Sequence, residues 1–336
     1  MTPLVSVCVT TFNHGPYIQQ AMDSFLSQET TFEFEVLVHD DASSDGTTEI
    51  IRQYEAKYPE TVHVYYETEN QWGKGTYKGG YNRGLLVPHS RGKYIAMCEG
   101  DDYWTDSQKL QMQVDYLESH PEVSLCCHAA KVLDGCTGQE LGIMGMGNQE
   151  HDISAQELIC GWNIPTASWV YRKGALDGLD DEWPFDKPAG DFPSVLYASR
   201  SGAIHYWPRT MSAYRYQTPG SWTSALKDSN RALANARRWI CMYDNLDKST
   251  NGIWHQEFVG AAKDYVRTVI AACPGDSESG LSQFGIEVRG HFSATDKAKV
   301  AVKRILRKAG YELVQVGYGK SKRHRLIKVE SANDRH

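Results

Sequence analysis

Apolar and polar residues alternate along the first half of the chain in a pattern that predicts strand and helix units. Residues 5–11 are apolar and β-branched, as expected of a buried parallel strand, and turn formers follow at residues 13–15. Apolar residues then recur at helical spacing up to residue 28, behind Pro16, which suits the first position of a helix. The chain is therefore expected to open with a strand, a turn and a returning helix.

The same order is repeated further along the chain. Strands are expected at residues 34–39, 62–66 and 94–98, and helices at residues 48–58 and 107–119. Short connections between such units imply right-handed crossovers, which place the strands in a parallel sheet with helices on both faces. We therefore expect a Rossmann-like α/β fold for the N-terminal half.

The second half carries weaker signals. Strands are expected at residues 123–133, 166–171 and 203–214, a helix at 191–201, and a mobile loop at 134–151. After residue 224 the strand signal fades and helical patterns follow at 224–246 and 254–273. The expected organisation is an α/β domain over residues 1–223 and a helical extension over residues 224–336.

The last part of the extension is basic. Residues 296–328 hold eleven Lys or Arg against two acidic residues, and Ala298, Val302, Ile305 and Ala309 share one helical face. We expect a basic amphipathic tail. Three interpretations stay open for it: a solvated helix face, attraction to an anionic inner membrane leaflet, or nucleic-acid binding.

Composition limits the possible partners and the compartment. The formal net charge of -7 gives no reason to expect nucleic-acid binding. No signal peptide is evident and no window approaches the roughly 20 apolar residues that a membrane-spanning helix needs. The eight cysteines form no CxxC pair and are interpreted as buried thiols of a reducing compartment. A cytoplasmic protein is expected, peripheral on the cytoplasmic face of the membrane if the tail binds it.

Polar clusters follow three of the predicted strands, at residues 10–13, 40–45 and 99–102. In an open α/β sheet, ligands bind outside the carboxyl ends of the strands, so these clusters are expected to share one cleft. Glu99, Asp101 and Asp102 would repel one another unless a cation lay among them. Mg²⁺ or Mn²⁺ takes one or two carboxylates and leaves positions for phosphate oxygens, so a diphosphate is the expected partner.

Plainer interpretations exist for both acidic clusters. The segment 99–102 is also compatible with a solvated turn in which Asp106 or Ser107 caps the next helix, and the segment 40–47 with a well-capped loop. The joint occurrence of the clusters at successive strand ends favours a ligand site.

Residues 5–13, then 40–47 and then 99–104 resemble, in order and spacing, the inverting family 2 glycosyltransferases with the GT-A fold. The likeness covers roughly residues 4–225 and leaves the C-terminal third unassigned. It implies that Thr10, Phe12 and Asn13 line a nucleoside pocket, where Asp40 or Asp41 accepts a hydrogen bond from the base. Asn13 as a helix cap and Phe12 as a core aromatic residue are the alternatives.

The resemblance also implies a metal site and a catalytic base. Asp101 and Asp102 are similar to the metal-binding pair of the family, while Glu99 stands where the first Asp is often found. The sequence Gly190-Asp191-Phe192-Pro193 is similar to the motif of the family's base, which makes Asp191 the candidate. A plain helix N-cap is the alternative for Asp191, and Asp180, Asp181 and Glu182 are rival acids.

Further residues are candidates for donor or sugar contacts. Arg215 lies in a segment resembling the one that closes over the donor diphosphate in relatives, and is expected to steady the leaving phosphate. Gln217 occupies a position often filled by a histidine near the metal, so this departure puts protein ligation there in doubt. Trp104 and Trp222 are candidates for stacking on a sugar ring, or else core residues.

These features together predict a metal-dependent inverting glycosyltransferase of the hexosyltransferase type, using Mn²⁺ or Mg²⁺. The resemblance favours a UDP- or dTDP-sugar donor, a saccharide or lipid-linked saccharide acceptor, and a role in bacterial surface polysaccharide or glycoconjugate synthesis. A dehydrogenase would need GxGxxG after the first strand, and a nucleotidyltransferase a Gly-rich loop with Arg, and both are missing. The remaining alternative is a catalytically inert carbohydrate-binding or scaffold relative.

Overall fold

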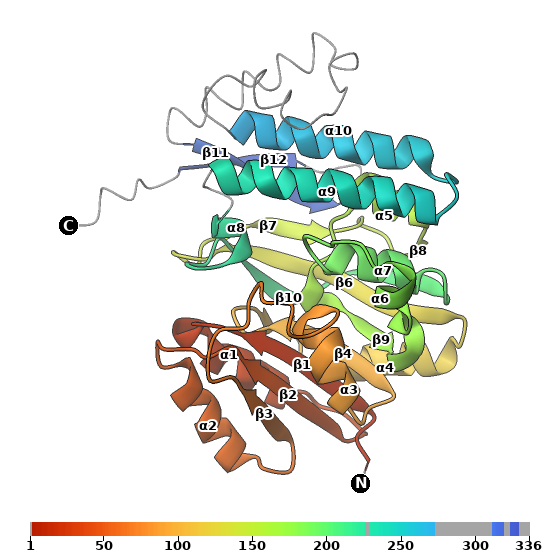
Figure 1. The fold of residues 1–336 in the computed structure, drawn as a ribbon. Helices are drawn as coiled ribbons and strands as arrows, with labels where there is room; N and C mark the ends of the chain where they lie inside the picture. The colour runs from red at the N-terminus through yellow and green to blue at the C-terminus, as the bar shows by residue number, and fades with distance from the viewer. Residues whose placement is uncertain (1, 226–228, 273–310, 319–322, 329–336) are drawn as a thin grey trace, which may run out of the picture. The chain divides into compact units, whose positions relative to one another are not determined.

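The computed structural model describes residues 2–225, 229–272, 311–318 and 323–328, and its chain falls into two compact units (Figure 1). The described part of the first unit comprises residues 2–182, 189–218 and 317–318. The second contains residues 183–188 and the described residues from 219 onward, apart from 317–318. Each unit is described by itself below.

The first unit is built on four parallel strands in the order β3-β2-β1-β4. Their bounds are Val5–Thr11 for β1, Phe34–Asp40 for β2, Val62–Tyr66 for β3 and Tyr94–Glu99 for β4. The helices α1 (Gly15–Leu26) and α2 (Thr47–Lys57) follow β1 and β2. The register pairs Thr10 with both His39 and Glu99, so the carboxyl ends of β1, β2 and β4 lie at one edge of the sheet. The predicted convergence of strand ends is confirmed for these three strands.

One apolar cluster explains why these elements pack together. It joins β1 side chains (Val5, Val7, Val9) to residues of α1 (Ile18, Met22, Phe25) and of α4, Lys109–Ser119 (Leu110, Val114, Leu117), all essentially inaccessible to solvent. The period of two on the strand and of three to four on the helices brings one face of each element into the core.

Antiparallel strands extend the sheet beyond β4. Strand β9 (Val170–Arg172) pairs antiparallel with β4 and with β6 (Val123–Asp134), and β7 (Glu140–Gly145) pairs antiparallel with β6. The long strand β10 (Ala203–Tyr216) runs parallel to β6 and carries β5 (Tyr103–Trp104) and β8 (His151–Ile153) as antiparallel partners. This mixed, mostly parallel sheet flanked by helices confirms the predicted fold class.

Short helices complete the first unit. They are the π-helix η1 (Asn82–Leu86), α3 (Val87–His89), α5 (Ala155–Gly161), the 3₁₀ turns η2 (Thr166–Ser168) and η3 (Lys173–Leu176), α6 (Leu179–Glu182) and α7 (Asp191–Ala198). Helix α5 begins with a capping box in which the Ser154 hydroxyl accepts from the Glu157 N–H and the Glu157 carboxylate accepts from the Ser154 N–H.

Several expectations for this unit are corrected. Residues 134–151 are not a featureless loop, because they contain β7 and reach the first residue of β8. Strand β7 forms a hairpin with the preceding β6, whereas β8 pairs with the distant β10. Residues 166–171 form a 3₁₀ turn before β9 instead of one strand. Among the described cysteines four are buried, but Cys136, Cys160 and Cys241 are exposed thiols.

The second unit contains the predicted helices with shifted bounds. These are α8 (Trp222–Ala225), α9 (Ser229–Ser249) and α10 (His255–Ala272), with α9 and α10 side by side in Figure 1. Trp239 stacks on Tyr265 at a centroid distance of 5.2 Å, and the Asn235 side-chain amide donates to the Tyr265 hydroxyl (2.7 Å). The sequence did not predict strands here, yet β11 (Tyr311–Tyr318) and β12 (Arg323–Lys328) form an antiparallel pair.

Two expectations bear on the membrane. The apolar helical face predicted within residues 298–309 lies outside the described residues. Within the described part of the chain, every helix is too short or too polar to pass through a bilayer.

Candidate active site

Asn13 ties together the loops that follow β1 and β2. Its backbone N–H donates to the Ser43 hydroxyl (2.9 Å), and its side-chain oxygen accepts from the Ser44 N–H (2.9 Å). Next to it, the Gly15 N–H donates to Asp45 Oδ2 (2.8 Å). Asn13 has a positive φ of 53°, a conformation that asparagine tolerates better than most residues. Its side chain therefore holds two loops at the strand ends and does not cap α1.

Thr10 and Phe12 lie at the same edge of the sheet. Thr10 is partly exposed near the end of β1, between β2 and β4. Phe12 is 41% exposed, which excludes the alternative that it is a core aromatic residue. An exposed ring beside polar loops is available to a flat ligand.

Asp40 and Asp41 are both buried, but their carboxylates hold different segments. Asp40 accepts from the Ser43 N–H (3.2 Å) and the Thr48 hydroxyl (2.5 Å), and so orders its own loop. Asp41 accepts from the Gln71 N–H and the Tyr81 hydroxyl, each at 2.7 Å. Asp41 thereby attaches the glycine-rich segment after β3 to the end of β2.

The carboxylates after β4 form a strained electrostatic cluster. Burial, followed by repulsion from Asp101 and Asp191, raises the pKa of Glu99 to about 8. Burial, with repulsion from Asp101 and Glu99, also raises the pKa of Asp102 well above its ordinary value. These mutual effects bring four acidic residues from two distant segments into one electrostatic site.

Hydrogen bonds from β10 and from the residues that follow it hold the acidic turn in place. The Arg215 backbone N–H donates to Asp102 Oδ1 (2.8 Å), and the Thr218 hydroxyl donates to Asp101 Oδ2 (2.7 Å). The Arg215 guanidinium donates to the backbone carbonyl of Asp101 and to the side-chain oxygen of Gln20. A positive charge therefore lies directly beside the acidic turn.

Aromatic rings hold the Arg215 guanidinium from two sides. Its central carbon lies 5.0 Å from the Tyr17 ring centroid and 4.7 Å from that of Tyr103. Cation–π contacts in a mostly buried position restrict the guanidinium to one orientation. This arrangement offers a preorganised cation for an anionic ligand.

The acidic cluster suits a hard divalent cation in the manner of Mg²⁺ or Mn²⁺. Carboxylate oxygens are the ligands those ions prefer, and a cation would offset the repulsion that raises the pKa values of Glu99 and Asp102. Among the described residues, no three His, Cys, Asp or Glu side chains are arranged as ligands of one ion. Mg²⁺ in proteins is commonly held by one or two carboxylates, with phosphate oxygens and water completing its shell.

Asp191 is the first residue of α7 and lies close enough to Glu99 to raise its pKa. Burial raises the pKa of Asp191 itself. Its Oδ1 atom is buried and has no hydrogen-bond partner among the described residues. The N-cap of α7 is Gly190, and the Asp191 carboxylate at the first helical position accepts from the backbone N–H groups of Asp191 and Phe192, which lower its pKa against the effect of burial. An unpaired acceptor oxygen beside the acidic cluster is available to take a proton.

The rival acids are all engaged in α6. Asp180 forms a two-pronged ion pair with Arg83, and Asp181 is paired with Lys78. Glu182 accepts from the Tyr197 hydroxyl (2.7 Å) and from an Arg200 guanidinium nitrogen (2.6 Å). Their structural engagement favours Asp191 over them as a proton acceptor.

The structure describes the side chain of only one of the two tryptophans that were candidates for stacking on a sugar. Trp104 is only 4% exposed, its indole N–H donates to the Ala167 carbonyl (3.0 Å), and its ring meets Phe25 edge-on at 4.8 Å. A sugar-stacking role for Trp104 is therefore contradicted, because its ring is buried in the core and is not accessible to a sugar. The side chain of Trp222 lies outside the described part of the structure.

Gln217 is held by the backbone geometry at the end of β10. It has a positive φ of 61°, and its side-chain amide donates to the Tyr216 hydroxyl (3.2 Å). Its relation to a metal remains an expectation.

Two residues of the site were missed from the sequence. His14 Nε2 lies 3.9 Å from Asp101 Oδ2, and its Nδ1 is buried without a hydrogen-bond partner among the described residues. Thr218 donates to the same carboxylate oxygen. His14 directly follows the polar cluster after β1, so the strand-end rule applied one residue further would have included it. Thr218 carries no comparable local signal.

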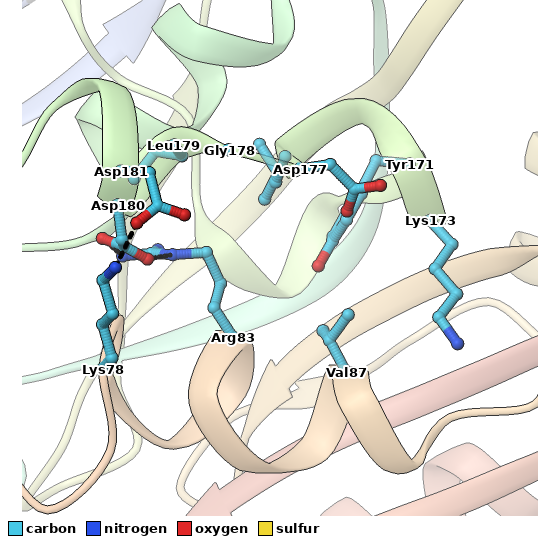
Figure 2. Close-up of a pocket in the computed structure, with 11 residues that line it drawn as sticks. Lys78, Arg83, Val87, Tyr171, Lys173, Asp177, Gly178, Leu179, Asp180 and Asp181 are labelled. Atoms are coloured by element: carbon cyan, nitrogen blue, oxygen red, sulfur yellow. Dashed lines mark hydrogen bonds and ion pairs between the residues drawn. The ribbon is translucent and has the colours of Figure 1, made fainter.

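A separate cavity of about 220 Å³ lies beside η1 and α6. Figure 2 shows its lining residues, with dashed contacts from Arg83 and Lys78 to Asp180 and Asp181. The cavity contains none of the carboxylates after β4 and not Asp191. It is therefore distinct from the acidic site, although Arg83 connects its wall to α7.

Comparison with known proteins adds sequence relatives. Residues 6–177 match the family model described as glycosyl transferase family 2. An uncharacterized protein of Mycobacterium tuberculosis is 35% identical over 229 residues, which are 68% of this chain and 63% of that protein. The chain thus matches less than two thirds of the length of this relative.

Solved structures add similarity of fold. S. aureus TarS 1-349 in complex with UDP-GlcNAc has a TM-score of 0.52 at 15% identity, over 97% of this chain and 99% of that chain. The mannosyltransferase PcManGT from Pyrobaculum calidifontis, in complex with GDP-Man and Mn²⁺, has a TM-score of 0.53 at 17% identity, over 92% and 88%. At these identities the likeness establishes the fold alone.

Proposed function

Because the chain belongs to glycosyl transferase family 2 and has the GT-A fold, we propose that it transfers a sugar from a nucleotide-sugar to an acceptor hydroxyl with inversion at the anomeric carbon. The observation that carries the proposal is the buried, unpaired Asp191 Oδ1 beside the acidic turn after β4. A hydrolase or transferase that inverts in one displacement needs one such base and no covalent intermediate.

Asp101 and Asp102 would hold a Mn²⁺ or Mg²⁺ ion, whose positive charge would favour the ionised form of Glu99. When bound, the ion supplies neutralisation of the charge on the nucleoside diphosphate leaving group. Arg215 supports the same task from the protein side, since its guanidinium is fixed next to Asp101 by Gln20 and two aromatic rings.

In the transfer step, Asp191 Oδ1 takes the proton of the acceptor hydroxyl. The acceptor oxygen bonds to the anomeric carbon from the face opposite the nucleotide, and the bond from that carbon to the phosphate oxygen breaks. The electron pair of that bond leaves with the nucleoside diphosphate. The raised pKa of Asp191 makes it a stronger proton acceptor than an ordinary carboxylate once it is ionised.

The donor nucleoside is proposed to lie against Thr10, Phe12 and the loop of Asn13. The exposed Phe12 ring supports this placement. The base is proposed to be a pyrimidine that donates to Asp40 or Asp41, hence a UDP- or dTDP-sugar. The acceptor is proposed to be a saccharide or a lipid-linked saccharide in bacterial surface glycan synthesis.

Calorimetric titration of UDP, GDP, dTDP and CMP, with Mn²⁺ and with EDTA, tests the donor site. The critical variant is Asp102→Asn, whose side-chain oxygen still accepts the Arg215 N–H while the charge is removed. The exposed Asp115→Asn is the matched control. We expect one nucleotide to bind in a Mn²⁺-dependent way to the wild type and the control, and weakly to Asp102→Asn. Binding of no nucleotide under any condition would favour an inert relative.

Asp191→Asn separates binding from chemistry. The nucleotide should bind this variant as it binds the wild type, because Asp191 does not touch the proposed nucleotide contacts. Transfer of sugar from the selected nucleotide should fall by about 10²- to 10⁴-fold, the usual worth of a general base. Initial rates with a panel of sugars on that nucleotide measure this, and a fully active Asp191→Asn would remove Asp191 from the mechanism.

A further inference from the structure

The glycine-rich segment of residues 70–86 is attached to the rest of the first unit at both ends. At its start and middle, Gln71 and Tyr81 donate to the Asp41 carboxylate, and Tyr81 also stacks on His39 at 4.2 Å. At its end, Arg83 reaches α6 and α7. One short segment therefore contacts both the proposed nucleoside side and the helix that begins with Asp191.

Arg83 uses all three guanidinium nitrogens. Nε and Nη2 donate to Asp180 Oδ2 (2.9 Å) and Oδ1 (3.2 Å), and Nη1 donates to the Ser194 hydroxyl (2.9 Å). Figure 2 shows the side chain of Arg83 extended toward Asp180. Both partners of the ion pair are largely shielded, with side chains 15% and 19% exposed. A bidentate pair in this environment fixes the guanidinium plane.

Ser194 connects Arg83 to the start of α7 through hydrogen bonds. Its hydroxyl accepts from Arg83 and donates to the Gly190 carbonyl (2.5 Å), which also accepts the Ser194 N–H (3.2 Å). A Cβ atom added to Gly190 would lie 3.5 Å from Arg83 Nη1, in ordinary van der Waals contact, so the guanidinium lies close to this position. Gly190 lacks a side chain and cannot cap the helix itself.

The Asp191 backbone follows Gly190 directly. The peptide joining the two residues includes the carbonyl that Ser194 holds, so its orientation sets where the Asp191 side chain starts. We propose that Arg83 is a positioning residue for Asp191, acting through Ser194 and the Gly190 carbonyl. The inference rests on the proposed function, in which Asp191 is the base.

Amide hydrogen exchange of the full chain, followed by mass spectrometry of peptides covering residues 189–198, tests the positioning directly. In Arg83→Gln, exchange of these amides should be about tenfold faster than in the wild type, because a charge-assisted hydrogen bond to the first turn is lost. The matched control is Lys78→Gln, which removes an exposed ion pair to α6 in the same cavity wall without a hydrogen bond to α7. It should leave exchange at residues 189–198 within about twofold.

Two outcomes would overturn the inference. One is unchanged exchange at residues 189–198 in Arg83→Gln. The other is an equal increase there and in the distant strand β1, since that would mean general destabilisation. Ser194→Ala gives a second, independent reading: it should resemble Arg83→Gln, and the double variant should be no faster than either single variant. Additive effects would mean that Arg83 does not act through Ser194.

Catalysis distinguishes this inference from the proposed function. With UDP- and GDP-sugars as probes, Arg83→Gln should lower kcat about tenfold and leave the donor KM within about twofold, whereas Arg83→Lys should restore part of kcat. A fully active Arg83→Gln beside an inactive Asp191→Asn overturns the positioning role alone. A fully active Asp191→Asn overturns the base assignment, while the exchange data still decide whether Arg83 orders α7.

Discussion

At the residue scale, burial decides what each polar side chain does. Asp40 and Asp41 are adjacent in sequence, yet Asp40 orders its own loop and Asp41 holds Gln71 and Tyr81. Successive side chains along an extended chain point to opposite faces, so two neighbouring side chains meet different surroundings. A pair of identical residues in a motif can therefore carry two unrelated contacts.

Lys109 is the most unusual residue of the core. It is completely buried, its Nζ has no hydrogen-bond partner among the described residues, and it lies 4.2 Å from the Trp104 ring centroid. Burial lowers the pKa of its ammonium group to about 7. Burying an unpaired cation raises the free energy of the folded state, so Lys109 destabilises the protein whenever its ammonium group is charged.

We expect Lys109→Met to stabilise the protein most at low pH. Between about pH 7 and 10.5 the unfolded chain binds a proton at Lys109 that the folded chain does not, so wild-type stability rises with pH in that window. The advantage of the variant should shrink by about 1.4 kcal/mol per pH unit above pH 7. Urea unfolding at pH 6 and pH 9 measures the difference.

The control for this prediction is Lys57→Met. Lys57 also lies over an aromatic ring, at 5.0 Å from the Tyr58 centroid, but is exposed. As an exposed surface substitution it should change the free energy of unfolding by less than about 0.5 kcal/mol at both pH values. A constant advantage of Lys109→Met at both pH values would contradict the neutral state of the buried lysine.

At the element scale, the turn after β4 matters because it packs directly on β1. The Gly100 N–H donates to the Thr10 carbonyl (2.9 Å), which continues the pairing of β4 with β1 into the acidic turn. A Cβ at Gly100 would lie 2.8 Å from Thr11 Cβ and 3.0 Å from Ile18 Cδ1. The acidic turn can approach the strand end only because this position has no side chain.

Gly100→Ala should therefore lower the free energy of unfolding by about 1–3 kcal/mol through overpacking. It should also weaken Mn²⁺-dependent nucleotide binding, because the turn that carries Asp101 and Asp102 must move. Gly161→Ala, at the end of α5, is the matched control, since nothing lies within 4 Å of an added Cβ. Urea unfolding and calorimetry measure the two effects, and equal losses in both variants would refute the packing explanation.

At the scale of the whole molecule, the acidic cluster that serves the proposed function lowers the stability of the ligand-free protein. Glu99, Asp101, Asp102 and Asp191 come from two segments, and their repulsion raises the pKa values of Glu99 and Asp102. The fold keeps these charges together at a cost that a bound cation offsets.

Glu99→Gln should raise the melting temperature of the ligand-free protein by a few degrees at pH 8, since about 1 kcal/mol shifts the melting temperature by about 2–4 °C at this size. The amide oxygen preserves an acceptor for the Thr166 side chain. The additional stabilisation by Mn²⁺ and UDP should shrink in the variant. Thermal unfolding with and without both ligands tests this, with the exposed Glu122→Gln as control, and a less stable ligand-free Glu99→Gln would contradict it.

The local sequence pattern was sufficient to predict strands β1 to β4 and helices α1 and α2. It also predicted the edge of the sheet at which their polar loops meet. These elements depend on periodicity within about ten residues, and parallel connectivity then determines which ends lie together. The same reasoning predicted Asp101 and Asp102 as site residues, and the family resemblance predicted Asp191. It could not distinguish Trp104 as a core residue, because an aromatic residue in a motif has the same local signal whether exposed or buried.

Tertiary structure alone decided the remaining features. Strand β8 exists because β10, about fifty residues later in the chain, supplies its hydrogen-bond partners. The unpaired oxygen of Asp191, its closeness to Glu99 and the path from Arg83 to Gly190 join residues separated by about a hundred positions. Periodicity in a sequence reports which face of an element is buried, whereas the contacts of a charged side chain depend on which elements meet, and folding of the whole unit determines that.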